Sequence, residues 1–187
     1  MILADGTMGQ MMEPASLNVA EVTPVEKPWA LTGTKCEREH NIVNSLYLKP
    51  EELEIKNFER YQKYKTIEEN ETMYEEYLME DAEVCVVAFG ITARVAKNAV
   101  NEARKRGIKV GMIRPITLWP FPTKPLKAAA EKCKRFITVE MNMGQMIDDV
   151  RLAIDCKRPV DLCNRVGGMI PTPEDVLSAI MSNGGAE

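Results

Sequence analysis

The most regular pattern of hydrophobic and polar positions lies in the middle of the chain, between Val84 and Met146. Short apolar runs rich in β-branched residues alternate there with segments whose apolar residues recur at helical spacing. This alternation is typical of βαβ units in a parallel sheet. It predicts an α/β domain with an open, mainly parallel sheet flanked by helices. The expected strands are residues 84–89, 110–114, 135–140 and 160–165.

Helices are expected between these strands and after the last one. Thr92 is a candidate N-cap of the first helix, and Gly107 is a candidate C′ residue after it. Further helices are predicted at 125–134 and 145–155, where apolar residues are spaced i, i+3 and i+4. The sequence Thr-Pro-Glu-Asp at 172–175 predicts the start of the last helix, because it places a threonine N-cap, a proline and a carboxylate in order.

The first part of the chain has a different character. Prolines and glycines interrupt residues 1–50, which favours extended or looped backbone over helix. Residues 51–83 hold twelve acidic and four basic residues, and their apolar residues, Tyr74 and Tyr77 included, predict one or two exposed helices with a narrow apolar stripe. We therefore divide the chain into four expected parts: a short tail at 1–15, an irregular connector at 16–50, an acidic helical segment at 51–80 and the α/β domain at 81–183.

Composition narrows the class of protein. A hydrophobic fraction of 45% with 28% charged residues is typical of a globular protein, and no apolar run approaches the roughly 18 residues that a membrane span needs. Five cysteines without a CxxC pair argue against a disulfide framework or a metal-ligand set, and favour the reducing cytoplasm. Basic residues are matched by acidic ones with few aromatics between them, so neither a membrane nor a nucleic acid is an expected partner.

Candidate site residues follow the expected strands. Ligands of an open parallel sheet bind outside the carboxyl ends of its strands. An ion pair between Arg114 and Glu140 is favoured here over a catalytic role for Glu140, since structural ion pairs also shift the pKa values of carboxylates. Methionines at 141, 143 and 146 are suited to a partner interface. The polar residues expected to share this edge are Thr92, Arg94, Arg114, Glu140, Asn142 and Arg165.

Other catalytic motifs are absent from the sequence. The single histidine, His40, lies in a charged loop, and we expect its side chain to lie at the surface. Neither GxSxG nor GxGxxG nor GxxxxGK[ST] occurs. The sequence therefore names no catalytic, cofactor-binding or metal-binding residue, and the edge residues are expected to form a structural or interface surface.

Six motifs in order resemble the α subunit of 2-oxoacid:ferredoxin oxidoreductases, in its C-terminal portion. The chain looks nearest to the branched-chain, 2-oxoisovalerate type. The motifs are ADGTMGQMMEP at 4–14, WALTGTKCEREHNIVNSLYL at 29–48, AFGITAR at 88–94, IRPITLWPFP at 113–122, VEMNMGQM at 139–146 and GGMIPTPEDVL at 167–177.

The resemblance implies a fold, a reaction and partners. Residues 81–183 would be a transketolase C-terminal-like, Rossmann-like domain that serves as a scaffold and assembly module. The complete complex would use thiamine diphosphate with magnesium, [4Fe-4S] clusters and coenzyme A. Its other members would be a β subunit that binds thiamine diphosphate, a γ subunit and a ferredoxin-like δ subunit.

The same resemblance implies that a pyrimidine-binding domain would precede Met1, with residues 1–15 as the tail of that domain. None of the family's usual catalytic residues maps onto this sequence. The isolated chain is therefore expected to be inactive and to bind no thiamine diphosphate. Two alternatives stay open: an independent, non-catalytic α/β interaction module, and the C-terminal domain of a transketolase or a dehydrogenase E1 component.

Overall fold

The computed structural model describes residues 1, 3–4, 6–12, 14, 16 and 23–182. The chain divides into two units. One contains the described residues of 1–10 and 64–187, and the other contains those of 11–63. Helix α2 (Pro50–Asn70) contributes to both.

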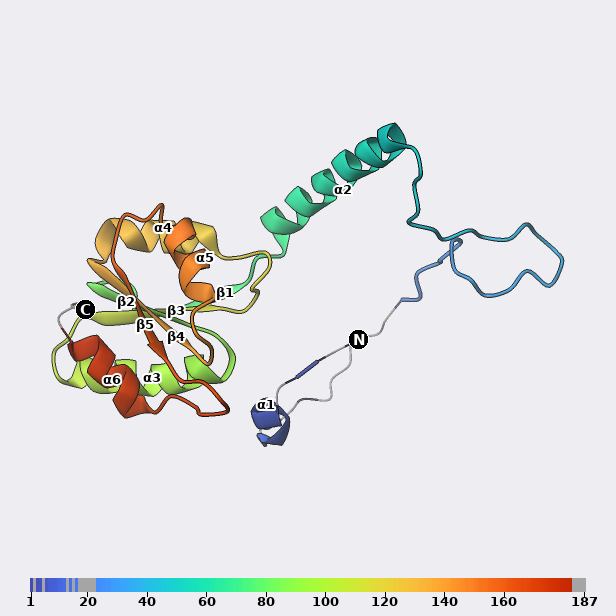
Figure 1. The fold of residues 1–187 in the computed structure, drawn as a ribbon. Helices are drawn as coiled ribbons and strands as arrows, with labels where there is room; N and C mark the ends of the chain where they lie inside the picture. The colour runs from blue at the N-terminus through green and yellow to red at the C-terminus, as the bar shows by residue number, and fades with distance from the viewer. Residues whose placement is uncertain (2, 5, 13, 15, 17–22, 183–187) are drawn as a thin grey trace. The chain divides into compact units, whose positions relative to one another are not determined.

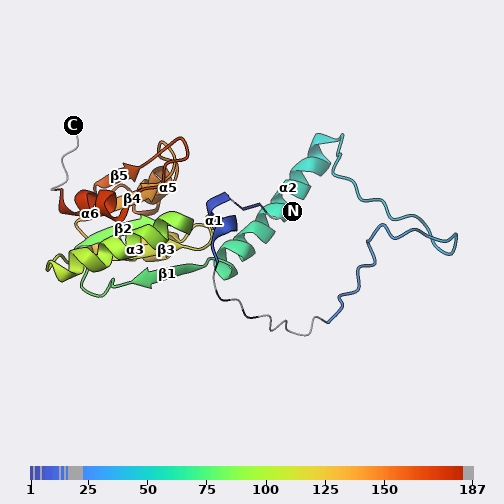
Figure 2. The same ribbon diagram turned by 90° about the horizontal axis from the view of Figure 1, so that it is seen from below.

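The larger unit is built on a five-stranded sheet with the order β1-β3-β2-β4-β5 (Figure 1). Strands β2 to β5 pair in parallel, and β1 pairs antiparallel with β3. In the view of Figure 2, β1 and β5 lie at opposite edges of the sheet. The predicted open, mainly parallel sheet is confirmed. The strands are β1 (Tyr74–Tyr77), β2 (Val84–Ala88), β3 (Val110–Pro115), β4 (Arg135–Glu140) and β5 (Val160–Asn164).

Helices cover both faces of this sheet (Figure 1). Side chains of α3 (Gly90–Lys105) and α6 (Pro173–Met181) pack with Val86 and Met112 in one core layer. Side chains of α4 (Thr123–Lys132) and α5 (Met146–Ala153) pack with Cys85 and Phe136 in the other. Successive strand residues point to opposite faces, so each central strand contributes to both layers.

The predicted signals are confirmed at the start of α6 and at the end of α3, but not at the start of α3. Asp175 N–H donates to the Thr172 hydroxyl at 3.2 Å, and Thr172 N–H donates to the Asp175 carboxylate at 2.9 Å, so the predicted capping box is confirmed. Gly107 has a φ of +81° after the last turn of α3, as expected of a C′ glycine. The prediction that Thr92 caps α3 was wrong: Phe89 is the N-cap, and the Thr92 hydroxyl donates to its carbonyl.

Two short elements contradict the sequence interpretation. Helix α1 (Gly6–Gln10) forms where loop or extended backbone was expected. Tyr74 and Tyr77 were expected on a helix but begin and end strand β1. Strand β1 forms because its backbone pairs with β3, with Glu75 opposite Arg114 and Tyr77 opposite Met112. Its alternation places Glu75 and Tyr77 toward α3, where the Tyr77 hydroxyl donates to Asn101 at 2.7 Å.

The connection from β1 to β2 passes close over β3. A Cβ atom at Gly111 would lie 2.5 Å from the Leu78 carbonyl oxygen, so only glycine fits there without movement of the backbone. Arg104 of α3 fixes this connection by donating to the carbonyls of Leu78 and Val110, and it also pairs with Asp81 at 2.7 Å. The packing at Gly111 therefore holds β1 against the parallel part of the sheet.

In the second unit, no described residue is fully buried. Apolar residues of α2 recur at every third position, at Ile55, Phe58, Tyr61, Tyr64 and Ile67. Three residues turn an α-helix by about 300°, so residues at this spacing wind around the helix. The narrow stripe predicted from the sequence is therefore wrong for α2.

Candidate functional site

Strands β2 to β5 are parallel, so their carboxyl ends meet at one edge of the sheet. The chain leaves β2 toward α3 on one face and leaves β4 toward α5 on the other, which makes this a topological switch point. The six polar residues expected at this edge follow or end these strands in the structure. Their partners decide what the edge can do chemically.

Glu140 is the last residue of β4 and is 1% exposed. One carboxylate oxygen accepts hydrogen bonds from the backbone N–H groups of Gln145 and Met146, at 2.9 and 2.8 Å. The other accepts from Ile147 N–H at 2.9 Å. These donors form the N-terminal turn of α5, where the helix dipole favours a negative charge. Glu140 therefore occupies the anion-binding position of α5 with an internal carboxylate.

The predicted ion pair between Arg114 and Glu140 was wrong. Arg114 instead donates to Glu75 on the neighbouring strand β1, at 3.2 Å. Strand β2 lies between β3 and β4, so the two residues stand two strand spacings apart, roughly 10 Å. The sequence did not show which strands are neighbours.

Glu75 is shared by two basic residues. Lys97 of α3 donates to one of its carboxylate oxygens and Arg114 donates to the other, both at 3.2 Å. Hydrogen bonds from Lys97 and then Arg114 lower the pKa of Glu75 below its usual range. Lys97 also lies over the Tyr77 ring, 4.4 Å from its centroid. The cluster ties β1 and β3 to α3.

The turn after β4 is fixed by the side chains of two asparagines. The side-chain oxygen of Asn142 accepts a hydrogen bond from Gly144 N–H at 2.7 Å. The backbone carbonyl of Asn142 accepts one from the side-chain NH₂ group of Asn164, also at 2.7 Å. Gly144 has a φ of +102°, in the left-handed region that favours glycine. Met143 is 78% exposed on this turn. The turn thus presents an apolar side chain from a well-defined backbone.

Arg165 pairs with the residue that caps the last helix. It donates to both carboxylate oxygens of Asp175, at 2.6 and 3.2 Å. This contact, followed by the hydrogen bond from Thr172 N–H, lowers the pKa of Asp175 to about 2. Arg114, Glu140, Asn142 and Arg165 are all engaged by partners within the chain.

The cysteines of the core are equally unsuited to covalent chemistry. Cys85 and Cys133 are buried, as their apolar-periodic positions predict. Burial raises the pKa of both thiols above the ordinary value. Since the thiolate is the nucleophile, neither residue is activated.

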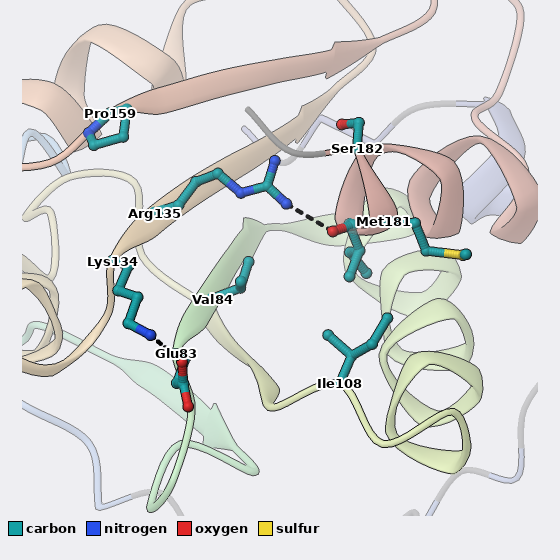
Figure 3. A pocket seen from close by; sticks show the side chains of 9 residues that line it. Glu83, Val84, Ile108, Lys134, Arg135, Pro159, Met181 and Ser182 are labelled. Atoms are coloured by element: carbon teal, nitrogen blue, oxygen red, sulfur yellow. Dashed lines mark hydrogen bonds and ion pairs between the residues drawn. The ribbon is translucent and has the colours of Figure 1, made fainter. Parts of the chain in front are cut away.

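A pocket that the sequence did not indicate lies at the opposite edge, where the parallel strands begin (Figure 3). Its volume is about 540 Å³. Arg135 donates there to the Ile180 carbonyl at 2.6 Å and pairs with Asp161, while Lys134 pairs with Glu83. The charged groups of this pocket therefore bind each other. Only the fold brings 83–84, 108, 134–135 and 180–182 together, so no local sequence signal could have found it.

Within the described ranges, no group of three or more His, Cys, Asp or Glu side chains could hold a metal ion. Within the same ranges, no helix is both long and apolar enough to cross a bilayer.

The fold is that of an α/β domain with an open, mainly parallel sheet. Residues 82–176 match the family described as pyruvate:ferredoxin oxidoreductase core domain II. This match covers more than half of the chain, and the chain belongs to that family.

Curated relatives support the same assignment. The ketoisovalerate oxidoreductase subunit VorB of Methanothermobacter marburgensis is 48% identical over 182 residues, which cover 96% of this chain and 51% of that protein. The 2-oxoglutarate synthase subunit KorA of Methanothermobacter thermautotrophicus is 37% identical over 107 residues, 57% of this chain and 28% of the relative. The chain thus spans about half the length of the nearer of these two relatives.

Solved structures support the fold. The 2-oxoglutarate:ferredoxin oxidoreductase of Magnetococcus marinus matches with a TM-score of 0.60 and 23% identity, over 72% of this chain and 23% of that one. A split-gene transketolase, described as an inactive β4 tetramer, matches with a TM-score of 0.51 and 22% identity, over 58% of this chain and 40% of that one. The expected likeness to transketolase is confirmed at the level of the fold.

Proposed function

We propose that this chain is the scaffold and subunit-assembly portion of a thiamine diphosphate-dependent 2-oxoacid:ferredoxin oxidoreductase. The observation that carries the proposal is the match of nearly the whole chain to about half of an oxidoreductase subunit. The carboxyl edge supports a non-catalytic role, because Glu140 and Arg114 form hydrogen bonds with groups of the same chain.

The proposed reaction is the oxidative decarboxylation of a 2-oxo acid with coenzyme A. The 2-oxo acid and coenzyme A yield the acyl-CoA and CO₂, and two electrons pass through [4Fe-4S] clusters to ferredoxin. Thiamine diphosphate with magnesium supplies the carbanion chemistry of this reaction. We assign these groups to parts of the complex outside this chain, with the β, γ and ferredoxin-like δ subunits as its partners and the cytoplasm as its location.

The 2-oxoisovalerate type is the proposed substrate class. The relatives named ketoisovalerate oxidoreductase match 96% of this chain, whereas the KorA relative above matches 57%. The alternative of a transketolase C-terminal domain is supported by the fold alone, at 22% identity.

Reconstitution tests the activity. The chain is co-purified with its neighbouring subunits, and coenzyme A-dependent viologen reduction is measured with pyruvate, 2-oxoisovalerate and 2-oxoglutarate. We expect the fastest reduction with 2-oxoisovalerate. Equal rates with all three acids would refute the substrate class, and a lack of activity with every acid would refute the proposal as a whole.

Calorimetry tests the proposal that thiamine diphosphate binds outside this chain. The isolated chain is titrated with thiamine diphosphate in the presence of magnesium, and we expect no heat of binding. Micromolar binding would place the cofactor on this chain and overturn the scaffold role.

A further inference from the structure

A groove of about 600 Å³ lies beside the carboxyl end of β3, between the end of α2, the start of β1 and the loop before α4. It belongs entirely to the larger unit. The IRPITLWPFP motif supplies one wall of the groove, and neither the fold nor the proposed reaction explains this motif. The lining residues are Glu68, Glu69, Thr72, Tyr74, Trp119, Pro120, Phe121, Thr123, Lys124 and Pro125.

The walls of this groove are held in place from behind. The Tyr64 ring packs edge to face on Trp119, with centroids 5.5 Å apart. The Met73 carbonyl accepts from the backbone N–H groups of Ile116 and Thr117, at 3.0 and 3.1 Å. The Thr117 hydroxyl donates to the Pro120 carbonyl at 2.8 Å. A partner would therefore meet a preformed surface, which lowers the entropic cost of binding.

Aromatic side chains remain exposed on these fixed walls. Trp119 is 56% exposed and Tyr74 is 43% exposed. Trp and Tyr are enriched among the residues that dominate binding energy at protein interfaces, because they bury a large apolar area with little loss of side-chain freedom. The groove thus has the anchor residues of a docking site for an apolar segment.

The rim adds a charge preference. Glu68 and Glu69 lie on the α2 wall, and Lys124 is the one basic lining residue. A lysine or arginine on the partner would find its counter-charge on this wall. A second copy of the chain is disfavoured, because a two-fold contact would bring the same carboxylates together.

We propose that this groove receives an apolar segment carrying a lysine or arginine, contributed by the half of a VorB-like subunit that lies outside the matched region. The inference rests on the proposed function. The relative VorB extends well beyond the region that this chain matches, so that protein contains additional polypeptide. Trp119 and Tyr74 bind the apolar side chains of the segment, and Glu68 and Glu69 bind its basic residue.

The test uses the full 187-residue chain. The probe is the portion of Methanothermobacter marburgensis VorB outside the matched region. It is co-expressed with the chain and then separated from it, and the affinity of the chain for the probe is measured by calorimetry. We expect Trp119→Ala to weaken binding roughly 10- to 100-fold, the range of an interface hot spot. The matched control is Trp29→Ala, which removes an equally exposed tryptophan, 63% exposed, outside the groove.

A charge reversal at Glu68 and Glu69 provides the second measurement. Both side chains are exposed, so their replacement should not impair folding. The double change Glu68→Lys and Glu69→Lys should weaken binding and reduce its dependence on salt. The same change at Glu51 and Glu52, in the first turn of α2, alters the net charge equally and should leave the affinity unchanged.

The outcomes separate the two proposals. If the wild-type chain binds the probe and the Trp119 and Glu68/Glu69 variants bind as tightly, the groove proposal is wrong and the proposed function stands. If the wild-type chain does not bind the probe, the groove proposal is wrong, and the proposed function is then judged by the reconstituted activity alone. If sedimentation shows self-association that Trp119→Ala abolishes, the occupant is a second copy and the groove proposal is overturned.

Discussion

Glu140 makes the sharpest stability prediction. Replacing it by alanine removes the acceptor of three backbone N–H groups. Two of these belong to residues that are 3% and 6% exposed, Met146 and Ile147, so they would be left without water. An unsatisfied buried donor costs about 1–3 kcal/mol, and the hydrogen bonds lost are charge-assisted. We expect Glu140→Ala to lower the free energy of unfolding by roughly 3–5 kcal/mol, out of the 5–15 kcal/mol typical of a domain.

The assay is urea denaturation followed by circular dichroism near neutral pH. Glu140→Gln should lose less, about 2 kcal/mol, because its carbonyl still accepts while its NH₂ group faces a donor. Glu131→Ala is the control, since this exposed carboxylate pairs with Lys157 and should contribute nothing measurable. If Glu140→Ala unfolds at the same urea concentration as Glu131→Ala, the three hydrogen bonds do not hold α5 as argued.

Two further predictions concern the capping box and the closest backbone approach. The pKa of Asp175 is lowered to about 2, chiefly by Arg165. In the unfolded chain this pKa is about 3.9, so the carboxylate stabilises the folded state above pH 3.9. That stabilisation is lost as the pH falls toward 2. The difference in melting temperature between wild type and Asp175→Asn should therefore shrink between about pH 4 and pH 2, and a constant difference would refute this assignment. Gly111→Ala should destabilise the domain by about 1–3 kcal/mol in urea, because its Cβ would meet the Leu78 carbonyl. Gly9→Ala, in α1 and with nothing within 4 Å, should not destabilise it, and an equal loss in both variants would contradict the close approach.

The strands of the parallel sheet could be predicted because each carries its own signal. The run at 84–89 is apolar at every position, and strand β2 is buried on both faces by helices, which is what such a run indicates. The Thr172 capping box is equally local, since its two hydrogen bonds join residues three apart. Fold class and helix ends followed from signals of this short range.

Three of the features that the sequence did not indicate share a physical reason. Tyr74–Tyr77 reads as part of an acidic helix, yet pairing with β3 makes it a strand, and that pairing involves residues about forty positions away. The partner of Arg114 could not be inferred for the same reason, because Glu75 is adjacent only through that antiparallel pairing. The lining of the groove joins α2 to the loop before α4, two segments some fifty residues apart. Contacts of this range depend on the order of strands in the sheet.

The position of Glu140 bears on how the carboxyl edge is read. In doubly wound folds, the N-terminus of a helix at this edge binds a phosphate through its free N–H groups. Here those groups at α5 are bound by the chain's own carboxylate, and Asn142 and Asn164 fix the turn that leads to them. A ligand anion would have to displace a buried, triply hydrogen-bonded side chain. The edge therefore presents Met143 from a fixed backbone, and this arrangement favours contact with other polypeptide over the binding of a cofactor phosphate.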